Sequence, residues 1–213
     1  RGDTKIDFTD RNVRTSSFEP SRREQSLYNA VTDYVRTHYS KQAGQHLVML
    51  MLQKEVVSSP WAVLSTVEKW LDDDGRDVTG RERDKLLSIA KQARQIERTT
   101  KQEKLLEIIR SVNRRMDTGR TIVFTQFRAT QDAIVNALQT DAGGEDVPVH
   151  RVSGSLSSGE KDDQIQHFKE RGGVLVTTDS ISEGRNIQFC NVIINYDLPW
   201  NPMSVEQRIG RID

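Results

Sequence analysis

The hydrophobic pattern of the chain changes its period near residue 119. Before that point, apolar residues recur at spacings of three and four, which is the period of one face of an α-helix. After it, short continuous apolar runs alternate with helical stretches of about ten residues. The pattern therefore predicts a mainly helical lead-in over residues 1–118 and an α/β unit over residues 119–213.

The first part predicts a series of helices joined by short connections. The stretch 47–57 is apolar on most of its circumference, so we expect it to be buried. Ser59 followed by Pro60 is typical of a helix start, with serine as the cap and proline in the first helical position. The expected helices lie around residues 27–35, 47–57, 60–71, 81–98 and 105–116.

The second part predicts a parallel sheet. Ser157 and Glu160 have the spacing of a capping box and indicate a helix start between two of the apolar runs. Strands that alternate with helices are joined by right-handed crossovers and pair in parallel. The expected strands are 121–125, 147–152, 174–178 and 192–196, with helices over 128–138 and 158–169 between the first three.

Polar residues follow each predicted strand. In a parallel sheet these positions meet at one edge, where ligands bind. Loop hydroxyls, amides and free backbone N–H groups are suited to phosphate. Taken singly, each loop also fits an ordinary turn or strand end; together they predict a phosphate-contacting edge. The loops are 125–128, 153–155, 177–186 and 197–201, which contain Gln126, Arg128, Ser153, Gly154, Thr177, Thr178, Asp179 and Asp197.

The end of the chain carries a paired-arginine run. Arg208 and Arg211 are three positions apart in a helix expected to begin at Asn201-Pro202, and Gly210 lies between them. Guanidinium groups remain charged and form two-pronged hydrogen bonds with phosphate oxygens. The alternative is a solvated helix with surface arginines.

Composition narrows the classes of function. The formal net charge is zero, so any contact with nucleic acid must come from a local patch. The single Cys190 excludes an internal disulfide and, between Phe189 and Val192, is expected to be a buried spectator. The four histidines lack metal-ligand spacing, and no apolar run approaches about 18 residues. Because the sequence begins at Arg1 and stops inside a patterned helix, we expect a fragment of a longer protein.

These motifs resemble the second RecA-like lobe of superfamily 2 helicases and translocases. The likeness is greatest to the Swi/Snf-type branch and, within it, to the bacterial RNA-polymerase-associated ATPase and its archaeal and bacterial relatives. Glu183 and Arg185 depart from the commoner Swi/Snf pattern and agree with that branch. The matching runs are 121–127 (motif IV), 182–186 (within motif V), 196–202 and 206–211 (motif VI).

The resemblance implies a role for each site residue. Arg211 would be the arginine finger that reaches the γ-phosphate of ATP, with a second arginine expected one position past the terminus. Gly184 and Asn186 would face the nucleotide, and Gln207 would help to couple the nucleotide to the opposite lobe. Arg208 would share the phosphate contact or form a salt bridge within the lobe. The six loop residues, from Gln126 to Thr178, would contact the nucleic-acid backbone.

The sequence lacks two motifs that such an ATPase needs. It contains no Gly-Lys pair of a phosphate-binding loop and no Asp-Glu pair of a magnesium motif. We therefore expect ATP and Mg²⁺ to be bound mainly by a first lobe preceding Arg1, and this chain alone to hydrolyse ATP negligibly. The resemblance implies a protein that follows duplex DNA, with RNA polymerase or another DNA-bound complex as partner. We expect it to be cytoplasmic, nucleoid-associated if it is prokaryotic, and without membrane contact. The alternatives are a strand-separating helicase and a non-catalytic binding or scaffold module.

Overall fold

The structure is a computed structural model, which describes residues 12–38, 46–73, 78, 80–115, 119–141, 147–178, 187–199, 201, 203 and 208. Its helices are α1 (Arg22–His38), α2 (His46–Ser58), α3 (Pro60–Asp72), α4 (Gly80–Arg94), α5 (Thr100–Arg115), α6 (Arg128–Asp141) and α7 (Ser158–Arg171). Its strands are β1 (Arg120–Phe124), β2 (Val149–Val152), β3 (Gly173–Thr177) and β4 (Val192–Asn195).

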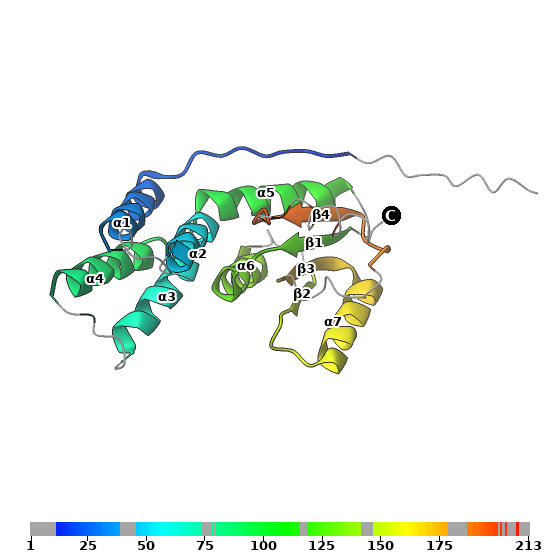
Figure 1. Ribbon diagram of the computed structural model, residues 1–213. Helices are drawn as coiled ribbons and strands as arrows, with labels where there is room; N and C mark the ends of the chain where they lie inside the picture. Colours follow the sequence, from blue (N-terminus) through cyan, green and yellow to red (C-terminus); the bar gives the residue numbers. More distant parts are fainter. Residues whose placement is uncertain are drawn as a thin grey trace, which may run out of the picture.

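The four strands form one parallel sheet in the order β2-β3-β1-β4. The central strand β1 pairs with β3 on one side and with β4 on the other, so that Val123 lies beside Val176 and Ile194. The helical first part is followed by this sheet with its flanking helices (Figure 1). The predicted α/β fold with a helical lead-in is confirmed.

Each face of the sheet is covered by its own helices. Alternate residues of a strand point to opposite faces, and β1 shows this directly. Val123 packs with residues of α5 and α6, whereas Ile122 and Phe124 pack with Ile165 and Phe168 of α7. The two inner strands, β1 and β3, are buried on both faces and are largely apolar, whereas the edge strand β2 carries His150 and Arg151.

The start of β3 requires glycine. Gly173 has a φ of +91°, a conformation that L side chains rarely adopt. A Cβ atom added there would overlap the carbonyl oxygen of Pro148 in the segment leading into β2. The residue therefore allows β2 and β3 to begin side by side.

Helices α1 to α4 form a separate hydrophobic core. Its buried members include Leu27, Val31 and Val35 on α1, which is the face that their spacing predicts. Ser59 caps α3 as expected, accepting a hydrogen bond from the Ala62 backbone N–H at 3.1 Å. This helical group lies beside the sheet, with α3 packed against α6 (Figure 1).

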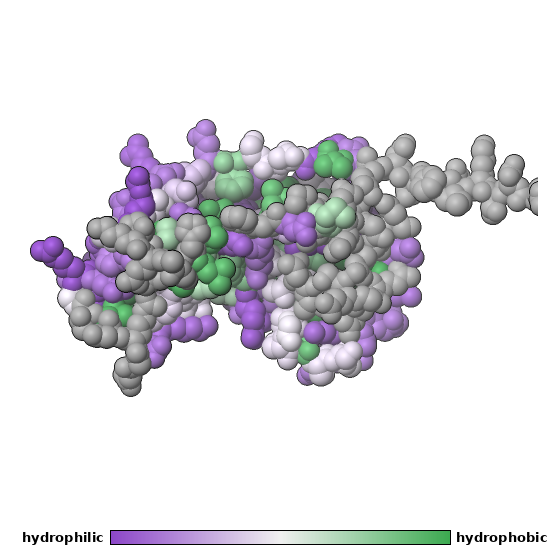
Figure 2. All heavy atoms as spheres, viewed as in Figure 1, coloured by the Kyte–Doolittle hydropathy of each residue, from purple (hydrophilic) through white to green (hydrophobic). Residues whose placement is uncertain are grey.

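The expectation that segment 47–57 is buried is wrong in part. Leu52 is buried, but Leu47 is 77% exposed and Val57 61% exposed. Helix α2 packs against α1 and α3, so its remaining circumference faces outward. Hydrophobic atoms are visible at the surface in this region of the molecule (Figure 2). When a helix is apolar on most of its circumference, the sequence alone does not show which of its faces pack against neighbouring elements.

Helix α5 joins the helical group to the sheet. At its first residue, the Thr100 hydroxyl donates to the Glu24 carboxylate of α1 at 2.7 Å. Further along, Leu105, Leu106 and Ile109 belong to the core of the sheet. The expected division at residues 118 and 119 remains a prediction, and the packing of α5 crosses it.

Candidate nucleic-acid and nucleotide interface

The carboxyl ends of all four strands lie at one edge of the sheet. Three backbone hydrogen bonds hold the ends together: Thr125 N–H donates to Thr177 O (3.0 Å), Thr178 N–H to Val152 O (3.4 Å) and Tyr196 N–H to Phe124 O (2.9 Å). From one side of the sheet to the other, the order is therefore the Ser153 turn, Thr178, Gln126 and Asp197. This is the edge that the sequence predicts as a phosphate-contacting site.

The six residues predicted to contact nucleic acid differ in exposure. Arg128, at the start of α6, and Gly154, in the turn after β2, are exposed. Gln126 and Thr178 are half-buried. These four residues carry a guanidinium, a glycine backbone, a side-chain amide and a hydroxyl, which are groups that commonly bind phosphate oxygens.

The other two, Ser153 and Thr177, have buried side chains. The Thr177 hydroxyl donates to the carbonyl oxygen of Thr178 at 2.6 Å, and the Ser153 and Ser155 hydroxyls bond to each other at 2.8 Å. The predicted contact of these two residues with nucleic acid stays a prediction. Their geometry matches the plainer interpretation, in which one ends a strand and the other shapes a turn.

Gln126 is fixed at both its main chain and its side chain. Its backbone N–H donates to Oδ2 of Asp197 at 3.0 Å, and its side-chain amide donates to the Leu198 carbonyl at 3.0 Å. Both partners belong to the segment that follows β4. The position of Gln126 at the edge is therefore set by that segment.

Asp197 lies at the centre of a buried polar cluster and is 7% exposed. Its carboxylate accepts hydrogen bonds from the hydroxyls of Ser58 (2.8 Å) and Thr125 (2.6 Å), and from Nζ of Lys101 (2.7 Å). Burial alone would raise the pKa of Asp197. The Lys101 charge and the hydrogen bonds outweigh it and hold the pKa below its usual range. The carboxylate is therefore ionised at neutral pH.

Arg208 is buried within the lobe. Its side chain is 1% exposed, lies 4.5 Å above the ring of Phe124, and donates from one terminal nitrogen to Oδ1 of Asn195 at 2.5 Å. Phe124 and Asn195 are the last residues of β1 and β4. Of the two expected roles, this position is compatible with a contact inside the lobe, and the bond to the Asn195 amide is one such contact. Sharing a phosphate would require this side chain to leave its packed position.

Four of the expected nucleotide contacts lie outside the described residues. They are Gly184, Asn186, Gln207 and Arg211. Their roles remain predictions.

Residues 100–213 match the family described as "Helicase conserved C-terminal domain". This stretch includes α5, the whole sheet and the paired-arginine run. The chain belongs to this helicase family. It is thus the C-terminal lobe of a superfamily 2 helicase, as its motifs indicate.

The helicase C-terminal domain has relatives among bacterial proteins. The chain is 34% identical over 212 residues to the "Uncharacterized ATP-dependent helicase YqhH" of Bacillus subtilis, covering 100% of this chain and 36% of that protein. It is 49% identical over 57 residues to the "RNA polymerase-associated protein RapA" of Vibrio campbellii, covering 25% of this chain and 6% of that protein. The chain therefore spans about a third of the first relative and a small part of the second.

Solved structures share the fold of this helicase domain. The "Sulfolobus solfataricus SWI2/SNF2 ATPase C-terminal domain" superposes with a TM-score of 0.56 at 21% identity, covering 84% of this chain and 68% of that chain. The "C-terminal part of Fun30 ATPase domain" superposes with a TM-score of 0.58 at 14% identity, covering 91% and 77%. Both matches extend across the helical group as well as the sheet.

Sequence reasoning missed two buried polar residues of the helicase domain. Asp197 was recognised only as a loop residue near the edge. Gln131 of α6 received no role, yet its amide donates to the carbonyls of Val152 (2.8 Å) and Val176 (2.9 Å) and thereby braces the ends of β2 and β3. The sequence offers one signal for Gln131: it lies three residues before the core residue Ile134, so both side chains are expected on the same face of α6.

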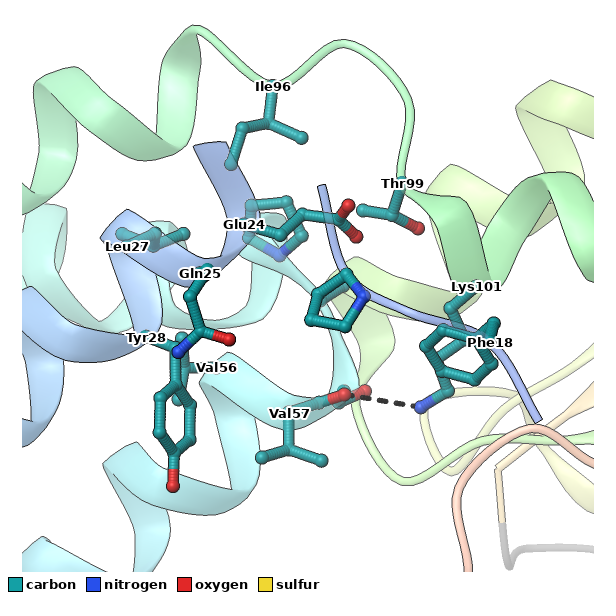
Figure 3. Close-up of a pocket in the computed structure, with 14 residues that line it drawn as sticks. Phe18, Glu24, Gln25, Leu27, Tyr28, Val56, Val57, Ile96, Thr99 and Lys101 are labelled. Carbon is teal, nitrogen blue, oxygen red and sulfur yellow. Dashed lines mark hydrogen bonds between the residues drawn. The ribbon is translucent and has the colours of Figure 1, made fainter. Parts of the chain in front are cut away.

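A cavity of about 250 Å³ lies between α1, the corner of α2 and α3, and the connection from α4 to α5. Phe18, Tyr28 and Val57 contribute apolar walls, and Lys101 closes one side with its ammonium directed at the Val57 carbonyl, 3.3 Å away (Figure 3). The same ammonium binds Asp197. The cavity is therefore adjacent to the Asp197 cluster.

Cys190 is a buried spectator, as expected. It is 3% exposed and packs in the core beneath α7, and burial raises the pKa of its thiol to about 12. A thiol with that pKa is not a nucleophile at neutral pH.

Within the described parts of the chain, no helix has the length and apolar character needed to cross a membrane.

Proposed function

We propose that this helicase domain is the second motor lobe of an ATP-dependent translocase that follows duplex DNA. The observation that most strongly supports this proposal is the match of residues 100–213 to the helicase C-terminal family. The gathering of four parallel strand ends at one edge supplies the surface that such a lobe needs. Duplex DNA as the track rests on the resemblance to Swi/Snf-type motors.

The nucleic-acid contact in this proposal comes from Arg128, Gln126, Gly154 and Thr178. The exposed guanidinium of Arg128 would bind a backbone phosphate, and the amide, hydroxyl and glycine backbone would bind neighbouring phosphate and sugar oxygens. Such contacts read no base edges, so binding would be independent of sequence and strongly dependent on salt.

The nucleotide contact comes from Gly184, Asn186, Gln207 and Arg211. Hydrolysis requires a water to attack the γ-phosphorus while the bond to ADP breaks, and charge accumulates on the γ-phosphate oxygens. Arg211 would neutralise that charge, a contribution of about 10³–10⁵ in rate for an arginine supplied across a cleft. Mg²⁺, when bound, would neutralise the β- and γ-phosphates. Among the described residues no group of three metal-binding side chains gathers, and the proposal assigns the metal to the first lobe.

The proposed cycle uses both contacts in turn. Arg211 closes onto the γ-phosphate held by the first lobe, and the two lobes approach. Loss of the γ-phosphate removes this bridge, and the lobes separate. The edge around Gln126 and Arg128 moves with the second lobe. If the two lobes hold the nucleic-acid backbone in turn, each cycle advances the protein along its track.

The test of this function is ATP hydrolysis by the full-length protein with duplex DNA, single-stranded DNA, RNA or no nucleic acid. We expect duplex DNA to stimulate hydrolysis most, with a stimulation that declines as salt rises. Replacing Arg128 with alanine should raise the DNA concentration for half-maximal stimulation and reduce the salt slope by about one phosphate contact. Arg171→Ala is the matched control, because this exposed arginine ends α7 at the opposite edge of the sheet.

Two outcomes would redirect the proposal. Displacement of a labelled strand during ATP hydrolysis would favour a strand-separating helicase, the activity for which the Bacillus subtilis relative is named. Absence of hydrolysis with every nucleic acid would leave a binding or scaffold module.

A further inference from the structure

One buried carboxylate joins three separate parts of the chain. The donors to Asp197 are Ser58 at the end of α2, Lys101 in the first turn of α5, and Thr125 with Gln126 after β1. They lie 139, 96, 72 and 71 residues away along the sequence. Asp197 therefore ties the helical group and α5 to the edge of the sheet.

The bonds to Asp197 reach the predicted nucleic-acid contact directly. The carboxylate orients the backbone of Gln126, and the next residue, Leu198, accepts from the Gln126 side chain. Lys101, which neutralises Asp197, also lies 4.2 Å above the ring of Tyr196. The segment 196–198 is thus fixed from the α5 side and in turn fixes Gln126.

The helical group is attached through the same point. Ser58 donates to Asp197, and the hydroxyls of Ser58 and Ser59 both bond to the Thr130 hydroxyl, at 2.8 and 2.6 Å. These groups are buried, so their hydrogen bonds are not exchanged for water. A shift of the helical group would have to break this network or move the edge with it.

We infer that Asp197 is a positioning residue that sets Gln126 at the nucleic-acid edge. The inference rests on the proposed function for its effect on nucleic acid. Asp197 does not itself contact the ligand. Its loss should therefore weaken the response to nucleic acid through Gln126.

The experiment compares variants of the full-length protein by the nucleic-acid concentration that gives half-maximal stimulation of ATP hydrolysis. Asp197→Asn keeps the size of the side chain but removes the charge and faces an N–H₂ group toward N–H and O–H donors. We expect the half-maximal concentration to rise about tenfold, the equivalent of one lost hydrogen bond, with a smaller change in the rate at saturation. Ser58→Ala removes only the donor that comes from the helical group, and should leave the half-maximal concentration within about twofold of the wild-type value.

A second pair of variants covers the case in which Asp197→Asn does not fold. Thr125→Val removes one donor to the carboxylate at constant shape, whereas Thr125→Ser retains it. Thr125→Val should raise the half-maximal concentration about threefold, whereas Thr125→Ser should keep it close to the wild-type value. Equal values for the two would overturn the inference, as would an unchanged value in folded Asp197→Asn.

A readout independent of ATP hydrolysis separates this inference from the proposed function. The backbone N–H of Gln126 donates to Asp197. Hydrogen exchange at this backbone N–H should therefore accelerate in Asp197→Asn and in Thr125→Val, and should not change in Ser58→Ala. Unchanged exchange would overturn the positioning role. A wild-type protein without nucleic-acid-stimulated hydrolysis would instead contradict the proposed function, and the exchange result would still decide the inference.

Discussion

At the scale of single residues, two buried carboxylates have opposite environments. Asp197 is surrounded by donors and a lysine, and its pKa is held low. Glu55 of α2 is 5% exposed, and among the described residues its carboxylate has one hydrogen-bond partner, the Thr66 hydroxyl at 2.7 Å from Oε1, while Oε2 has none. Burial raises the pKa of Glu55 to about 7, although the Thr66 bond and the Lys69 charge oppose this. Glu55 is therefore partly protonated at neutral pH.

The Glu55 environment predicts a pH dependence of stability. A carboxyl with a raised pKa favours the folded state fully below its unfolded value of 4.5, and this advantage is lost as pH rises toward 7. At about 1.4 kcal/mol per pKa unit, the shift from 4.5 to about 7 corresponds to a loss of at most about 3.5 kcal/mol. Glu55→Gln should flatten this dependence and raise the free energy of unfolding at pH 8 by about 1–3 kcal/mol.

Urea unfolding of the chain at several pH values between 4 and 8 measures this effect. Glu97→Gln, at an exposed position, is the control and should retain the wild-type pH dependence. If Glu55→Gln has the same pH dependence as wild type, the assignment of Glu55 as the responsible group is wrong.

The role of a residue could be predicted from the sequence only where its partners are its neighbours along the chain. The spectator role of Cys190 follows from its apolar neighbours in sequence. The hydrogen bonds of Asp197 do not, because its donors are supplied by distant segments that only the folded chain brings together. Arg208 illustrates the same limit: a motif indicates a charged group, but its packing on Phe124 depends on how β1 and β4 pair.

At the scale of elements, local sequence carried most of the information. Runs of β-branched residues locate the strands within one or two residues, and Ser157 with Glu160 marks the start of α7. In that cap the Ser157 side chain accepts from the Glu160 N–H at 3.3 Å, while the Glu160 carboxylate accepts from the Ser157 N–H at 2.8 Å. The exposed faces of α2 were not predicted, because they depend on how many neighbours the helix has.

The cap of α7 can be tested directly. Ser157→Ala removes the acceptor for the Glu160 N–H and should lower the free energy of unfolding by about 1 kcal/mol. Ser157→Thr retains a hydroxyl and should lie close to wild type. Urea unfolding measures both variants. Equal losses for alanine and threonine would show that the stabilisation does not come from the hydroxyl.

At the scale of the whole molecule, the helical group and the sheet share a connector and a polar junction. Helix α5 packs on the sheet and is bonded to α1 at its start, and the Asp197 cluster joins both to the loops at the edge. This arrangement places the helical group beside the surface proposed to grip nucleic acid. The sequence predicted the two parts, and their junction required the structure.

The central claim is that this lobe supplies the arginine finger of a DNA-stimulated ATPase. The most direct measurement is magnesium-dependent ATP hydrolysis by the full-length protein on duplex DNA, with Arg211→Ala and the control Arg171→Ala compared with wild type. We expect Arg211→Ala to lower the rate at least about 10³-fold while ATP binding changes little, and the control to behave as wild type. Wild-type hydrolysis by Arg211→Ala would contradict the claim.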